Sequence, residues 1–95
     1  MNQLALSARI AQASALRYTP AGLPALDLSL EHESEITEAG QPRQVKVAVK
    51  AVAFAGIAET LGAQAIGSSW TFTGFLATPR NGKHPVLHIQ SFVQS

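Results

Sequence analysis

The stretch from Leu16 to Leu30, "LRYTPAGLPALDLSL", joins a turn to the clearest strand pattern in the chain. Pro20 fixes its own φ angle and Gly22 can adopt a positive φ, so the chain can reverse direction there. Apolar and polar residues then alternate, as they do in a strand with one buried face. The pattern predicts a strand with Leu26, Leu28 and Leu30 facing the core and with Asp27, Ser29 and Glu31 facing outward.

The residues on either side of this stretch predict two further strands. Residues 4–11 alternate so that Leu4, Leu6, Ala8 and Ile10 share one side. Residues 43–54, "RQVKVAVKAVAF", predict a strand with Val45, Val47 and Val49 facing the core and with Lys46, Ala48 and Lys50 facing outward. The polar residues 34–42 contain Gly40 and Pro42, and we interpret them as a connection between strands.

The second half of the chain predicts a short helix followed by a two-stranded hairpin. Residues 55–65 contain helix formers, with Ile57 and Leu61 one helical turn apart. In residues 69–77, "SWTFTGFLA", a strand would direct Trp70, Phe72 and Leu76 inward and Thr71, Thr73 and Phe75 outward, with a bend or bulge at Gly74. Residues 78–85 then indicate a turn, and residues 86–93 a last strand.

The order of these elements predicts the fold class. Three strands, a short helix and two more strands in under ~110 residues are typical of an OB fold, a five-stranded Greek-key barrel that binds oligonucleotides or oligosaccharides on its strand 2–3 face. We therefore expect an all-β protein with one short helix. An SH3-like barrel or a meander has a similar element order and remains an alternative at this point.

Composition limits the class of protein further. With 95 residues, the chain is expected to form a single domain over residues 1–95 that gains stability by self-association. It contains no cysteine, which excludes disulfides, thiol nucleophiles and thiolate metal sites. No long apolar run or secretory signal is visible, so we expect a cytoplasmic protein. The formal net charge of +1 means that a basic surface requires folding to gather scattered cations.

Several motifs together resemble one known family. They are "TPAGLPALDLSLEHESE" at residues 19–35, "EAG" at 38–40, "RQ" at 43–44, "GSSWTFTGFLA" at 67–77 and "VLHIQ" at 86–90. In this order they resemble primosomal replication protein N (PriB), a family related to the bacterial single-stranded DNA-binding proteins. The resemblance implies an OB-fold homodimer, with strand 1 as the expected edge, that binds single-stranded DNA without strong sequence preference. It also implies a role with the PriA helicase and DnaT in restarting stalled replication forks.

The chain departs from that family at two places. Well-known members have an aromatic residue just after the Arg-Gln pair, where this sequence has Val45 and Lys46, and they have a more lysine-rich hairpin before the last strand. Both departures favour an alternative function, in which the OB barrel is mainly a protein-interaction module and DNA binding is secondary.

The predicted DNA contacts are cations and one aromatic residue. Scattered cations can follow a phosphate backbone if the barrel gathers them, and tyrosine can stack on any base. The predicted set is Arg17, Tyr18, Arg43, Lys46, Lys50, Arg80 and Lys83. The alternative for these residues is an ordinary solvated surface, or for Tyr18 a half-buried hairpin position.

The remaining polar and aromatic residues predict no catalytic or metal chemistry. Trp70 is expected in the core, while Phe75 is left open as a DNA contact or a protein contact. His84 and His88 would lie about 13 Å apart on one strand, too far to share a zinc ion. The Glu31, Glu33 and Glu35 series lacks an accompanying nucleophile, and we interpret it as solvated. We expect no enzyme activity, no cofactor and no metal.

Overall fold

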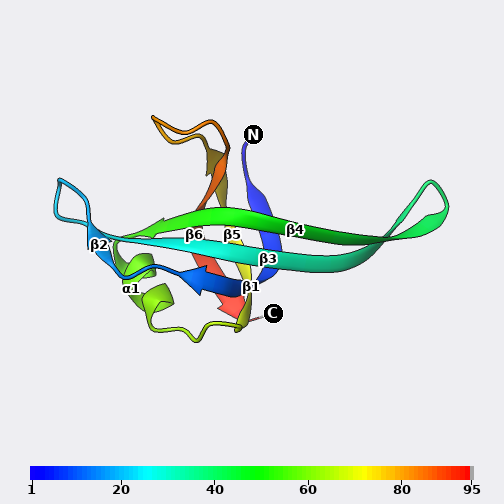
Figure 1. Cartoon of the computed structure of the whole chain (residues 1–95), viewed down its shortest axis with the longest axis horizontal. Coiled ribbons are helices and arrows are strands. Elements are labelled where there is room, and N and C mark those ends of the chain that lie inside the picture. Colours follow the sequence, from blue (N-terminus) through cyan, green and yellow to red (C-terminus); the bar gives the residue numbers. More distant parts are fainter. Residues whose placement is uncertain (95) are drawn as a thin grey trace.

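The computed structural model describes residues 1–94 and is built mostly of strands (Figure 1). The strands are β1 (Leu4–Ala13), β2 (Arg17–Tyr18), β3 (Pro24–Glu38), β4 (Gln41–Phe54), β5 (Ser69–Ala77) and β6 (Val86–Gln94), and the helix α1 spans Gly56–Gly62. The five predicted strands and the helix are all present. The two-residue strand β2, which pairs with the start of β3, was not predicted.

The strands close into a barrel. Neighbours in the sheet follow the order β1-β5-β6-β4-β3-β2, and an additional pairing of β1 with β3 joins the two sides. β4 and β6 run parallel, and the other pairs are antiparallel. The barrel therefore has five strands, with α1 between β4 and β5, and the OB-fold class is confirmed.

The core lies inside this barrel, where the alternation predicted it. Leu26, Leu28 and Leu30 of β3 are buried, together with Ile10 of β1 and Phe72 of β5. The helix adds Ala58 and Leu61, which pack into the same cluster. Burying one large apolar side chain contributes about 1.5–3 kcal/mol, so this cluster is the main stabilising feature of the fold.

A bulge interrupts the pairing of β5 with β6, where a bend was predicted. Thr73 pairs with Ser91 but Gly74 pairs with Ile89, which leaves one extra residue on β6. A Cβ atom at position 74 would overlap the carbonyl oxygen of His88. This close approach explains why a glycine occupies the middle of β5.

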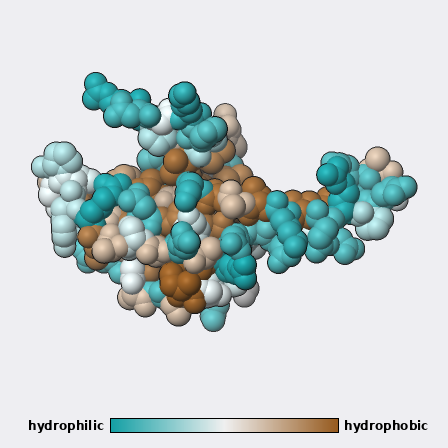
Figure 2. Space-filling model, viewed as in Figure 1, coloured by the Kyte–Doolittle hydropathy of each residue, from teal (hydrophilic) through white to brown (hydrophobic). Residues whose placement is uncertain are grey.

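The prediction of a connection over residues 34–42 is wrong. β3 and β4 stay paired from Ala25–Phe54 to Glu38–Gln41, so only Ala39 and Gly40 form the turn. Both turn residues have positive φ, 53° and 77°, as in the two-residue turns whose twist suits a hairpin. The polar composition reflects a hairpin with both faces in solvent. It projects from the barrel, at the right of Figure 1, and Figure 2 shows mainly hydrophilic side chains along it.

Two residues predicted in the core are exposed. Val47 is 43% exposed, because it lies on the projecting hairpin, while Val49, nearer the barrel, packs against the core. Leu76 is 37% exposed at the end of β5, beyond the bulge. Alternation determines which side of a strand a residue occupies, but not whether another element covers that side.

Within residues 1–94, no helix is long and apolar enough to cross a membrane.

Candidate nucleic-acid interface

The predicted lysine stripe lies on the outward side of β4, which together with the outward side of β3 we call the outer face. Residues directly opposite each other on paired strands share a face, and here Lys46 lies opposite Glu33 and Lys50 opposite Ser29. The Nζ atom of Lys46 is 3.3 Å from Oε1 of Glu33. The Nζ atom of Lys50 donates a hydrogen bond of 2.9 Å to Oγ of Ser29. On this mixed surface Lys46 therefore faces a carboxylate, whereas Lys50 faces a hydroxyl group.

Two further carboxylates of β3 hold arginines of neighbouring strands on this face. Glu31 forms an ion pair with Arg9 of β1. Asp27 accepts two hydrogen bonds from Arg17 of β2, at 2.7 and 3.1 Å. The hydrogen bonds from Arg17 lower the pKa of the Asp27 carboxyl, although its partial burial acts in the opposite direction. The same hydrogen bonding raises the pKa of Arg17, so the charged pair is the stable form at neutral pH.

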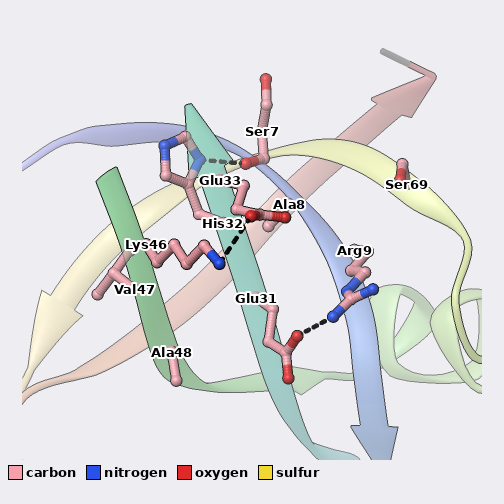
Figure 3. A pocket seen from close by; sticks show the side chains of 10 residues that line it. All are labelled: Ser7, Ala8, Arg9, Glu31, His32, Glu33, Lys46, Val47, Ala48 and Ser69. Atoms are coloured by element: carbon pink, nitrogen blue, oxygen red, sulfur yellow. Dashed lines mark hydrogen bonds and ion pairs between the residues drawn. The ribbon is translucent and has the colours of Figure 1, made fainter. Parts of the chain in front are cut away.

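A groove of about 570 Å³ lies over the outer face where β1, β3 and β4 meet (Figure 3). Both the Arg9–Glu31 and the Lys46–Glu33 pair line this groove. At its edge, Nδ1 of His32 lies 2.6 Å from the carbonyl oxygen of Ser7. The charged groups in the groove thus already satisfy one another.

Arg43 lies on the opposite side of the hairpin from the two lysines. Alternation along β4 places Arg43 with Val45 rather than with Lys46, and its partner is Glu38, with Nη1 and Oε1 2.6 Å apart. The structure therefore places Arg43, one of the predicted DNA contacts, on the opposite side of the hairpin from Lys46 and Lys50.

An aromatic cluster, made of Phe54, His88 and Phe75, covers the outer face at the barrel end. The rings of Phe75 and His88 stack with centroids 4.8 Å apart and planes at 18°. The Phe54 ring lies 5.9 Å from His88, and Phe54 is 37% exposed. His88 is adjacent to β4 because β6 pairs with it at Val52, and Phe75 lies directly opposite His88. Exposed rings at this position can stack on planar ligands.

The sequence pattern does not predict this cluster as a unit. It leaves the role of Phe75 open, it suggests His88 only as a candidate metal ligand, and it assigns no role to Phe54. A signal for Phe54 was present, because it shares the outward parity of Lys46 and Lys50. Its neighbours in the cluster, Phe75 of β5 and His88 of β6, come close to Phe54 only through the strand order of the closed barrel.

The loop between β5 and β6 carries two of the predicted cations, Arg80 and Lys83. This loop begins three residues after Phe75 and ends three residues before His88, and it projects beyond the barrel in Figure 1. Both side chains are exposed. Of the ion pairs found in residues 1–94, none involves Arg80, Lys83 or Lys50.

The two predicted aromatic positions have different surroundings. Tyr18 is 69% exposed, and alternation along β2 directs it away from the side that carries Arg17. Its stacking role stays a prediction. Trp70 is half-buried and packs against the core as predicted, with its ring edge-on to Phe92 at 5.0 Å and its Nε1 donating to Oγ of Ser68.

The part of the chain from residue 1 to 94 contains no group of three His, Asp or Glu side chains placed to hold a metal ion. The outer face carries cations, carboxylates and stacked rings.

Comparison with known proteins agrees with this fold. A family model described as "Another single-strand binding protein family" matches residues 2–91. The replication restart protein PriB of Bordetella pertussis is 48% identical over 91 residues, which cover 95% of this chain and 85% of that protein. A PriB structure from Ralstonia solanacearum superposes with a TM-score of 0.89 at 33% identity, covering 99% of this chain and 97% of that one.

A more distant structure extends the similarity beyond PriB. The single-stranded DNA-binding protein of Thermus aquaticus superposes with a TM-score of 0.79 at 25% identity, covering 98% of this chain and 49% of that one. The barrel, the family model and the identity to curated relatives agree. The chain belongs to the PriB replication restart proteins, within a family of single-strand binding proteins.

Proposed function

We propose that this protein binds single-stranded DNA without strong sequence preference, as an accessory protein of replication restart. The observation that carries the proposal is the aromatic cluster, which stands on the outer face of an OB barrel beside Lys50 and the Arg80–Lys83 loop. Stacking on an aromatic ring contributes about 1–3 kcal/mol per base and tolerates every base, because each has a π face.

The cations without a carboxylate partner supply the phosphate contacts in this proposal. They are Lys50, Arg80 and Lys83, whereas Arg17, Arg43 and Lys46 are each held by an acidic residue. On single strands each neutralised phosphate contributes about −0.7 to the slope of log affinity against log salt concentration. Three contacts therefore give a slope of about −2, and the six predicted cations would give about −4.

The proposal includes a homodimer formed through β1. In the sheet, residues 4–8 of β1 pair only with β5, while pairing with β3 begins at Arg9. Apart from the Ser7 carbonyl oxygen, which His32 contacts, the edge of residues 4–8 that faces β3 is thus open to a second strand, and open strand edges promote pairing with another chain. Sedimentation at micromolar concentration tests this point, and a species of only about 10 kDa, the mass of one chain, would contradict it.

The partners in this proposal follow from the resemblance to PriB. The curated relatives are named replication restart proteins, which supports a role in replication restart. The resemblance adds the PriA helicase and DnaT as the partners that this protein bridges to single-stranded DNA in the cytoplasm. Pull-down of purified PriA and DnaT by this protein, with and without oligo-dT, tests the bridge. Failure of both partners to bind in either condition would remove this part of the proposal.

Fluorescence anisotropy with labelled oligo-dT tests the DNA-binding function directly. We expect binding at low salt, a slope of about −2, and weaker binding to a duplex of matched length, since no helix among residues 1–94 is placed to read a major groove. Equal affinity for single and double strands would contradict the stacking mechanism.

A second candidate function is a protein-interaction module with secondary DNA binding. The observation that favours it is the pairing of Arg9, Arg17 and Lys46 with carboxylates, which leaves little net positive charge on the outer face. This function predicts tight partner binding together with only weak affinity for oligo-dT at low salt.

A further inference from the structure

The acidic residues of β3 are distributed unevenly along the outer face. All five acidic residues outside α1 lie on β3, and four of them hold a cation from a different strand. Glu38 holds Arg43 on the opposite side of the hairpin, and the other three, Asp27, Glu31 and Glu33, hold their cations on the outer face. Each of these three pairs is about half exposed or more, so the cations are reachable by solvent and by a phosphate group. A phosphate that approaches one of these cations meets a carboxylate already bound to it.

We propose that Glu31 and Glu33 compete with DNA phosphates for Arg9 and Lys46, and so confine single-stranded DNA to the barrel end of the outer face. The inference rests on the proposed DNA-binding function and deepens it by assigning a specificity-determining role to the two carboxylates. Glu31, where the pairing of β1 with β3 begins, and Glu33, on the hairpin just beyond it, repel the phosphate backbone from this part of the face. The barrel end, with Lys50 and the aromatic cluster, accepts it.

The energetics of exposed pairs set the size of the effect. An exposed ion pair is weak, so it does not exclude DNA outright. It does require each phosphate to displace a bound carboxylate and to remain beside that negative charge afterwards. Removing one such charge should raise affinity for oligo-dT about two- to fivefold at low salt, as expected when a pair of this strength no longer has to be broken.

The test uses Glu33→Gln and Glu31→Gln, which keep the side-chain shape and remove the charge. Each freed cation becomes a phosphate contact, so each variant should bind oligo-dT more tightly and with a salt slope steeper by about 0.7.

Glu35→Gln is the matched control. Glu35 lies on the same strand and the same face, opposite Gln44, and among the described residues no cation pairs with it. It removes the same charge without freeing a cation, so its salt slope should not change. Glu59→Gln, on the helix, controls for net charge far from the face.

A double-mutant cycle separates competition from general repulsion. In the wild-type background Lys46→Gln should change affinity little, because Glu33 already holds Lys46. In the Glu33→Gln background the same change should abolish the two- to fivefold gain. Additive effects in the two backgrounds would overturn the competition mechanism.

Different results would refute the proposed DNA-binding function and the competition by Glu31 and Glu33. If the wild-type protein does not bind oligo-dT at low salt, the proposed function is refuted and this inference with it. If the wild type binds but Glu33→Gln and Glu31→Gln match Glu35→Gln in affinity and salt slope, only the competition is refuted.

Discussion

Replacing Phe54 tests the aromatic cluster as the stacking platform. Phe54→Leu keeps an apolar side chain on the outer face and removes the ring, whereas Phe54→Ala removes both. Loss of one stacked base costs about 1–3 kcal/mol, which corresponds to a drop in affinity for oligo-dT of roughly 5- to 150-fold. We expect a drop in this range for both variants, measured by fluorescence anisotropy at low salt.

The stability cost of these variants should be small by comparison with a core substitution. Truncating a fully buried phenylalanine to alanine costs about 3–5 kcal/mol, and since Phe54 is 37% exposed we expect about 1–2 kcal/mol for Phe54→Ala. Leu76 provides the control, because it has the same fractional exposure and lies outside the aromatic cluster. Leu76→Ala should lose stability in urea unfolding and retain its affinity for oligo-dT.

Comparing the Phe54 and Leu76 variants also shows which results would refute the stacking role of the cluster. If Phe54→Leu binds oligo-dT as tightly as wild type, the cluster does not stack on bases. If Leu76→Ala loses as much affinity as Phe54→Ala, the loss reflects destabilisation of the barrel.

Three further predictions concern the fold. Val47→Glu should change the free energy of unfolding by less than about 1 kcal/mol because the site is exposed, whereas Leu30→Ala should cost about 2–5 kcal/mol. Equal costs in urea unfolding would place Val47 in the core. Gly74→Ala should lower the melting temperature measured by circular dichroism, because its Cβ would overlap the neighbouring strand, and an unchanged melting temperature would contradict the close approach. The Asp27–Arg17 pair lowers the pKa of Asp27, so the stability that the pair contributes is fully present above the ordinary aspartate pKa and is lost as pH falls through the lowered value. Carboxyl NMR titration of Arg17→Gln should show the pKa of Asp27 returning upward, and no shift would exclude the pair in solution.

Strand alternation made much of this fold predictable because it is a local property. The side chains of β3 sort correctly into buried leucines and outward polar groups from the sequence alone. The exposure of Val47 is different in kind. Val47 and Val49 have the same local pattern, but Val49 packs against the barrel core and Val47 is left uncovered by the other strands.

Predicting the pairing of Lys46 with Glu33 from the sequence requires recognising one turn, at Ala39 and Gly40. Once Ala39 and Gly40 are identified as a two-residue turn, the register follows and Glu33 must lie opposite Lys46. The turn was missed because its first residue is alanine, which rarely adopts a positive φ, rather than the asparagine, aspartate or glycine that marks such turns. Because the turn is not recognised, the sequence predicts an unpaired Lys46 where the structure has a Lys46–Glu33 ion pair.

The aromatic cluster could not be reached by the same route. Phe54, His88 and Phe75 meet because β6 inserts between β4 and β5 and runs parallel to β4, which follows from barrel closure rather than from any local signal.

Barrel closure also determines which kinds of side chain lie along the outer face. On the projecting hairpin, solubility requires charged side chains on a surface that nothing covers, and these charges neutralise one another across the register. At the barrel end, β6 lies beside β4 and β5 lies beside β6, so rings can be partly covered there and still present a face to solvent. The division of the outer face into paired charges and stacked rings therefore follows from where the barrel ends and the hairpin begins.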